Sequence, residues 1–136
     1  MRPVRAAILA VGAAALVVGC GGTPATSVAV TLRDVAIEPV PAEAPAGPVR
    51  FTVQNAGAAV HELEVFRVPP GVDGNALPLD DHMADTEALE IVDEVEEIAP
   101  STGATLSATL PSGTYVLICN IAGHYEAGMH STFTVH

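Results

Sequence analysis

Short runs of alternating apolar and polar residues, separated by turns, are the feature that most constrains the fold of this chain. Apolar side chains recur at every second position in five segments, which are residues 28–33, 49–54, 61–65, 105–110 and 132–135. Such an alternation gives a strand one face toward a core and one toward solvent. The triplets Asn55-Ala56-Gly57 and Pro111-Ser112-Gly113 supply turns. Many short strands with such turns predict an all-β fold, either a β-sandwich or a barrel.

One segment, residues 69–100, does not show this alternation of apolar and polar residues. It begins as a loop rich in Pro and Gly and then shows apolar residues at spacings of three and four, which are Ala88, Ile91, Val92, Val95 and Ile98. This spacing predicts one short helix that starts near Thr86, with Asp85 as its N-cap and Pro100 as its end. Ten of the 16 acidic residues lie between Asp73 and Glu97, so we expect the helix inside an acidic insertion.

The first 19 residues have the make-up of a secretory signal peptide. Arg2 and Arg5 precede an apolar run over residues 6–18, which is too short to span a bilayer, and Gly19-Cys20 follows. This end resembles a bacterial lipoprotein processing site, which implies that Cys20 becomes an acylated N-terminus.

Processing at Cys20 divides the chain into a signal peptide at residues 1–19, a lipidated cysteine and tether at residues 20–27, and one domain at residues 28–136. We therefore expect an extracytoplasmic protein that lipid anchors to the cell membrane, on its periplasmic or outer face. A retained short membrane anchor and plain secretion are the alternatives.

Charge excludes several kinds of partner. The formal net charge is −11 at pH 7, no lysine is present, and the only arginines beyond the signal peptide are Arg33, Arg50 and Arg67. Such an acidic surface does not bind nucleic acid and is repelled by anionic lipid headgroups. It fits either solubility alone or a partner with a basic docking face.

The strongest chemical signal lies in residues 115–135. Residues 115–119 have the pattern of a buried strand that ends on Cys119, and the loop that follows carries His124 and Met129 in the spacing Cys-x4-His-x4-Met. A thiolate, an imidazole and a thioether are soft ligands that select copper over magnesium or calcium. The two cysteines of an exported chain otherwise suggest one disulfide, but acylation of Cys20 leaves Cys119 as a lone thiol.

His61 is the candidate for the second imidazole that a trigonal copper site with a long axial methionine needs. It lies on the apolar face of its strand, in phase with Leu63 and Val65, so its ring points toward the core. A core histidine is more often structural than a ligand. Here, however, an inward imidazole needs a partner and an inward thiolate needs a cation.

Over about residues 28–136 the sequence resembles the cupredoxins, the family of type 1 blue copper proteins. The matching pieces are DVAIEPVPAEAPAGPVRFTVQNAGAAVHELEVF and YVLICNIAGHYEAGMHSTFTV. The wide ligand spacing is closer to the rusticyanin-, sulfocyanin- and auracyanin-like members than to plastocyanin. The resemblance implies a Greek-key β-sandwich, outer-sphere electron transfer, an electron port at the His124 edge, and one mononuclear Cu(I)/Cu(II) held by His61, Cys119, His124 and Met129.

Glu62 is a departure from the family pattern. The better-known relatives carry Asn or Ser after the first histidine, and that side chain ties the two ligand loops together near the sulfur. The strand alternation points Glu62 away from His61. A carboxylate this near is still expected to lower the reduction potential or to make it depend on pH. We also expect Asn120, which directly follows Cys119, beside the site.

Two other positions offer alternative copper contacts. Glu126 lies inside the ligand loop and competes with Met129 as the fourth ligand, although the soft thioether is favoured. The His82-Met83 pair in the acidic segment is either part of an ordinary exposed loop or a second, labile copper contact.

The leading functional hypothesis is a monomer that passes single electrons between redox protein partners at the membrane surface. An extracytoplasmic copper chaperone or copper store is the alternative, although an enclosed site with a cysteine releases its metal poorly. Multicopper enzymes need His-x-His and His-Cys-His pairs, and dinuclear copper sites need a second cysteine in the loop. The sequence has none of these, so we expect no enzymatic activity.

Overall fold

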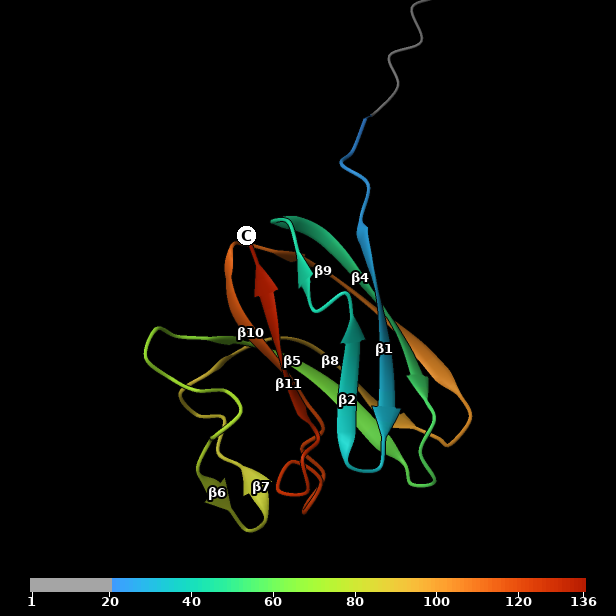
Figure 1. The fold of residues 1–136 in the computed structure, drawn as a ribbon, viewed down its shortest axis with the longest axis vertical. Helices are drawn as coiled ribbons and strands as arrows, with labels where there is room; N and C mark the ends of the chain where they lie inside the picture. Colours follow the sequence, from blue (N-terminus) through green and yellow to red (C-terminus); the bar gives the residue numbers. More distant parts are fainter. Residues whose placement is uncertain (1–20) are drawn as a thin grey trace, which may run out of the picture.

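Two β-sheets pack face to face in the computed structural model, which describes residues 21–136 (Figure 1). The first sheet has the strand order β2-β1-β4-β9. Its strands are β1 (Thr26–Arg33), β2 (Ala36–Val40), β4 (Gly47–Asn55) and β9 (Gly103–Leu110). The second sheet has the order β3-β11-β10-β5-β8. Its strands are β3 (Glu43–Ala44), β5 (His61–Val68), β8 (Glu90–Ile98), β10 (Gly113–Ile118) and β11 (His130–Val135).

The chain passes repeatedly between the two sheets, as in a Greek key. It crosses from β4 to β5, returns from β8 to β9, and crosses again from β9 to β10. The pairs β1–β4 and β3–β11 are parallel, and the other strand pairs are antiparallel. A small hairpin of β6 (Leu79–Asp80) and β7 (Met83–Ala84) stands apart from both sheets.

The alternating segments supply the core between the sheets, as their pattern predicts. The inward positions of β4 are buried from Val49 to Asn55, and Phe51 meets Phe133 of the other sheet edge to face, with ring centroids 5.3 Å apart. Edge-to-face packing of this kind adds to the gain from burying both rings. The predicted all-β sandwich is confirmed.

The predicted helix in the acidic insertion is wrong, because these residues form the edge strand β8. Two bulges explain the misleading spacing. Val92 has no partner between the pairs Val65–Asp93 and Phe66–Ile91, and Glu96 and Glu97 together face the single residue Glu62.

Each bulge adds one residue to β8 and shifts the phase of its alternation. The residues that turn inward therefore recur every third position, at Val92, Val95 and Ile98. β-branched side chains favour a strand, and the exposed edge of β5 offers the backbone a partner.

A second, smaller core covers the outer face of the five-stranded sheet. The segment between β5 and β8 folds over this face, and its Leu77 and Ala84 pack with Phe66, Val116 and Ile118 of the sheet. Strand β10 is therefore buried on both faces, as its unbroken apolar sequence indicates.

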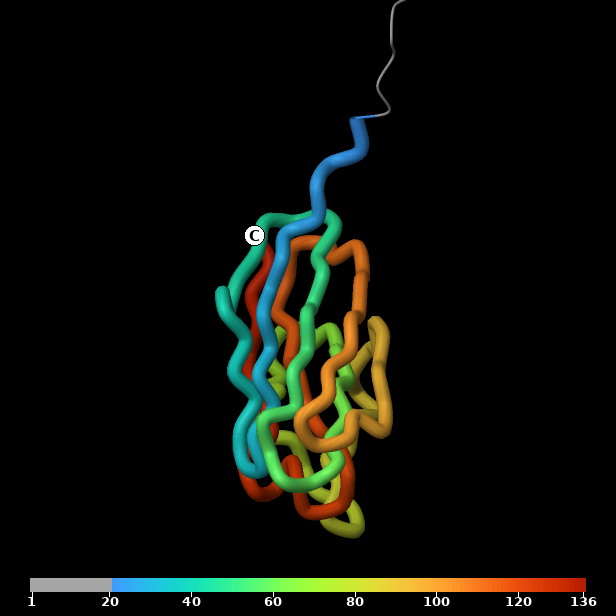
Figure 2. The backbone as a smooth tube through the Cα atoms, turned by 90° about the vertical axis from the view of Figure 1, so that its right-hand side faces the viewer, coloured from blue at the N-terminus to red at the C-terminus, as the bar shows by residue number. Residues whose placement is uncertain are grey.

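The two ends of the sandwich differ. Residues 21–25 leave at one end, whereas the loop between β10 and β11 and the β6–β7 hairpin lie at the opposite end (Figure 2). Within residues 21–136 no helix is long and apolar enough to cross a membrane. The predicted signal peptide and the acylation site Cys20 lie outside the described residues.

Candidate metal centre

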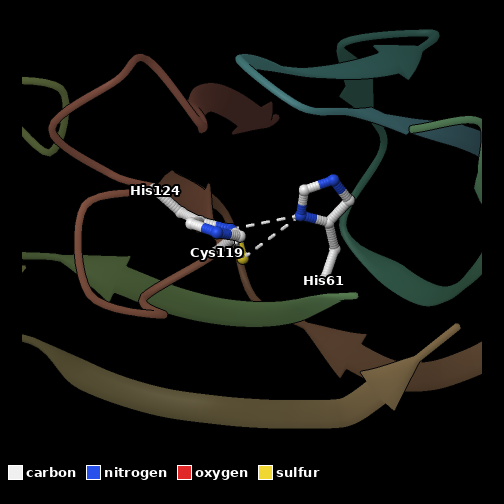
Figure 3. A group of neighbouring side chains, drawn as sticks. All are labelled: His61, Cys119 and His124. Atoms are coloured by element: carbon white, nitrogen blue, oxygen red, sulfur yellow. Dashed lines mark hydrogen bonds between the residues drawn. The ribbon is translucent and has the colours of Figure 1, made fainter. Parts of the chain in front are cut away.

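Three predicted ligands converge at the end of the sandwich away from residues 21–25. His61, Cys119 and His124 offer ligand atoms that all lie within 4.8 Å of one another. The two Nδ1 atoms are 3.2 Å apart, and Cys119 Sγ lies 3.9 Å from His61 Nδ1 and 3.3 Å from His124 Nδ1. Figure 3 shows the three side chains turned toward one point.

These separations fit a metal ion. An ion bound in one plane by two nitrogens at about 2.0 Å and a sulfur at about 2.3 Å holds its ligands roughly 3.5–3.8 Å apart. The observed separations of 3.2–3.9 Å bracket that range. Two imidazoles and a thiolate are a donor set for transition metals, and they exclude magnesium and calcium.

The turn before β5 fixes the backbone that carries His61. Asn55 is fully buried, and its side chain donates to the carbonyls of Ala59 and Ile98 while accepting from the N–H of Gly57. These bonds hold the β4–β5 turn against the end of β8. His61, the first residue of β5, therefore enters the core with its ring fully buried.

The ligand loop, residues 119–129, is closed by backbone hydrogen bonds. The N–H of Cys119 donates to the carbonyl of Met129, and the N–H of Met129 donates to the carbonyl of His124. Tyr125 anchors the loop from below, because its hydroxyl donates to the carbonyl of Gly74 and accepts from the N–H of Leu77. Cys119, His124 and Met129 thus sit on a loop fixed at both its base and its middle.

Burial shifts the pKa of two of the donors. It raises the pKa of the Cys119 thiol, an effect only partly offset by the backbone N–H groups of Glu62 and Ile121. Burial, followed by the proximity of His61, lowers the pKa of His124. A neutral imidazole keeps a lone pair for a metal, whereas a buried thiolate needs a nearby cation. A bound metal ion provides that positive charge.

Comparison with known proteins finds similarity among solved structures. No protein-family model and no curated protein sequence matches this chain. Reduced auracyanin from the photosynthetic bacterium Roseiflexus castenholzii superposes with a TM-score of 0.60 at 21% identity, over 82% of this chain and 98% of that one. Auracyanin B superposes with a TM-score of 0.59 at 24% identity, over 85% and 92% of the two chains.

Rusticyanin from Thiobacillus ferrooxidans superposes with a TM-score of 0.58 at 20% identity, over 83% of this chain and 79% of that one. Rusticyanin is itself a copper protein. The chain has the cupredoxin fold. At identities of 20–24% this similarity establishes the architecture alone.

Glu62 links the start of β5 to the segment that carries Cys119. Its N–H points at Cys119 Sγ at 3.4 Å, and its carboxylate accepts from the N–H of Asn120 at 2.9 Å. The Asn120 side chain in turn bonds to both backbone groups of Ala84 in the β6–β7 hairpin. Glu62 and Asn120 thus lie beside Cys119, one of the predicted ligands.

Met129 and Glu126, the two candidates for the fourth ligand, have different surroundings. Met129 is fully buried in the main core together with Cys119. The Glu126 carboxylate is half exposed and lies 3.0 Å from His82 Nδ1 in the hairpin. Burial beside Cys119 favours the thioether as the fourth ligand over a carboxylate that already has a partner.

Asp34 is a site residue that the sequence reasoning missed. It lies in the turn between β1 and β2, and its Oδ1 is 3.1 Å from His61 Nε2, on the side of the ring opposite the donor cluster. The two residues are 27 positions apart, and only the pairing of β1 beside β4 brings them together. The signal available in the sequence was an aspartate that directly follows a predicted strand.

Proposed function

We propose that this protein binds one mononuclear copper and carries single electrons. The observation that supports the proposal best is the convergence of His61 Nδ1, Cys119 Sγ and the half-buried His124 Nδ1 on a cupredoxin fold. Soft sulfur with two imidazoles is the donor set of blue copper sites. In this proposal the buried thioether of Met129 would supply the fourth ligand.

Copper bound there supplies a one-electron couple, and the protein holds its ligands still. Each donor sits on a fixed element: His61 on a strand, Cys119 at a strand end, and His124 on a loop pinned by Tyr125. Ligands locked by packing change little between the two oxidation states. The chain's own residues therefore favour fast electron exchange over transformation of a substrate.

His124 is the proposed electron port. His61, Cys119 and Met129 are fully buried, whereas His124 is only half-buried. Its ring is therefore the donor through which an electron takes the shortest path to the surface.

The proposed membrane anchor agrees with the position of this port. If Cys20 carries lipid, the chain enters the domain through residues 21–25, at the end opposite the donor cluster (Figure 1). A protein tethered there presents His124 away from the bilayer, toward other extracytoplasmic proteins. We expect its partner to be a redox protein with a basic face, because the chain carries a net charge of −11.

Voltammetry together with metal-transfer assays tests the proposal against a copper chaperone or store. We expect a reversible one-electron couple and slow loss of copper to a strong Cu(I) chelator. A carrier of metal predicts the reverse, with rapid copper release that slows when the exposed contacts are removed in His82→Ala and Met83→Leu. Rapid release without a reversible couple contradicts the electron-transfer proposal.

A further inference from the structure

The Asp34 carboxylate occupies a fixed place beside His61. Its oxygens accept from the N–H of Ala58 at 2.9 Å and 3.1 Å and from the N–H of Ala59 at 3.1 Å. Those two residues belong to the turn that leads into β5. The carboxylate is therefore held by the same backbone that carries His61, and it does not swing freely in solvent.

The contact with His61 decides where the imidazole carries its proton. Both carboxylate oxygens accept from backbone N–H groups, so Asp34 stands in this turn as a hydrogen-bond acceptor. His61 Nε2, 3.1 Å from Asp34 Oδ1, must then be the donor. With the proton on Nε2, the lone pair of a neutral ring lies on Nδ1, the atom that faces Cys119 and His124.

Gly57 leaves the room that this contact needs. A Cβ atom at this position would lie 2.3 Å from Asp34 Oδ1 and 2.7 Å from His61 Nε2. Any larger residue would displace one of the two groups. The turn at Gly57, the Asp34 carboxylate and the His61 imidazole thus pack tightly against one another.

We propose that Asp34 is the positioning residue of His61, fixing the tautomer and orientation with which Nδ1 meets the metal and adding negative charge behind the ligand. The inference rests on the proposed copper site. A carboxylate on the far nitrogen of a metal-bound histidine orients the ring and makes it a stronger ligand. That charge favours Cu(II) over Cu(I).

The tautomer is measurable in the metal-free protein. Long-range ¹H–¹⁵N NMR of the full chain should show His61 protonated at Nε2 and unprotonated at Nδ1. In Asp34→Ala this preference should be lost, with both tautomers populated. Gly57→Ala disturbs the same contact from the other side and should give the same result. The proposal is overturned if His61 is protonated at Nδ1 in the wild type, or if its tautomer is unchanged in both variants.

Copper binding supplies the second readout. We expect Cu(II) affinity to fall about 10- to 100-fold in Asp34→Ala. Asp34→Asn keeps an acceptor for Nε2 and removes only the charge. At a fixed applied potential it should shift the ratio of Cu(II) to Cu(I) about three- to tenfold toward Cu(I). Glu87→Gln, which removes an exposed charge from another loop, is the control and should change neither quantity.

Each result bears on a different claim. Equal shifts in Asp34→Asn and Glu87→Gln mean a general effect of charge and overturn the role of Asp34. Loss of Nε2 protonation in Asp34→Ala supports that role even if the wild type proves to bind no copper. Absence of copper binding by the wild type is a failure of the proposed function alone.

Discussion

At the scale of single residues, Glu64 has the least favourable surroundings. It lies opposite Glu94 in the β5–β8 pair, and one of its buried carboxylate oxygens has no hydrogen-bond partner within residues 21–136. Burial, and then the negative charges of Glu62, Glu94 and Glu96, raise its pKa to about 7. The folded protein therefore holds a proton on Glu64 that the unfolded chain releases near pH 4.5.

This difference makes stability depend on pH. Between about pH 4.5 and 7 only the folded state keeps the proton, so the free energy of unfolding should fall as pH rises through this range. We expect Glu64→Gln to be more stable than the wild type at pH 8 by about 1–3 kcal/mol and equal to it near pH 4. Urea denaturation at both pH values measures this, with Glu87→Gln as the control. An equal effect of Glu64→Gln at the two pH values contradicts the assignment.

Site residues that lie close together in the sequence could be predicted, whereas a contact between residues far apart in the sequence could not. Cys119 and His124 share one short loop, so their spacing in the sequence was enough to predict them as ligands. His61 was predicted because it lies on the apolar face of its strand. Asp34 was missed because a short polar residue after a strand has many ordinary roles. Its contact with His61 exists only once β1 and β4 pair.

At the scale of elements, β8 shows how a bulged strand imitates a helix. Two extra residues turn a period of two into a period of three, and a sequence pattern cannot distinguish that from a helical stripe. The segments that form β1, β4, β5, β9, β10 and β11 were predicted as strands, whereas the short strands β2, β3, β6 and β7 were not. One warning was present, because Glu94, Glu96 and Glu97 would oppose the dipole at the end of a helix. On an edge strand, such charges discourage pairing with other chains.

The bulge at Glu97 has a testable energetic consequence. Glu97 has a φ of 53°, in the left-handed region that favours glycine. Glu97→Gly should therefore stabilise the protein by about 1 kcal/mol. Glu96→Gly removes the same charge from a neighbouring position whose φ is not positive, and it should destabilise the protein by a similar amount. Thermal unfolding of the two variants measures both effects. If both variants are stabilised, the cause is the loss of a negative charge and not the backbone geometry at Glu97.

At the scale of the whole molecule, the donor cluster and part of the acidic segment share one end. The β6–β7 hairpin lies beside the ligand loop (Figure 1). The N–H of Gly123 in this loop donates to the carbonyl of His82 in the hairpin, where Asp80 and Asp81 are exposed. Negative charge beside the proposed port should steer a basic partner to it.

Electron transfer to a basic redox protein should therefore slow at least tenfold as ionic strength rises from about 0.01 to 0.5 M. Asp81→Asn should lower the rate at low salt more than Glu43→Gln, which removes an exposed charge from β3 near the other end. Stopped-flow kinetics measures both. A rate that does not change with ionic strength, or equal effects of the two variants, would contradict the proposal that the hairpin is part of the docking surface.

The visible absorption spectrum after addition of one equivalent of Cu(II) tests the central claim most directly. A copper ion held by the Cys119 thiolate, His61 and His124 should give an intense blue or green sulfur-to-copper band. Cys119→Ser should abolish the band, and His82→Ala, outside the cluster, should leave it unchanged. A colourless adduct, or a band that survives in Cys119→Ser, would contradict the account.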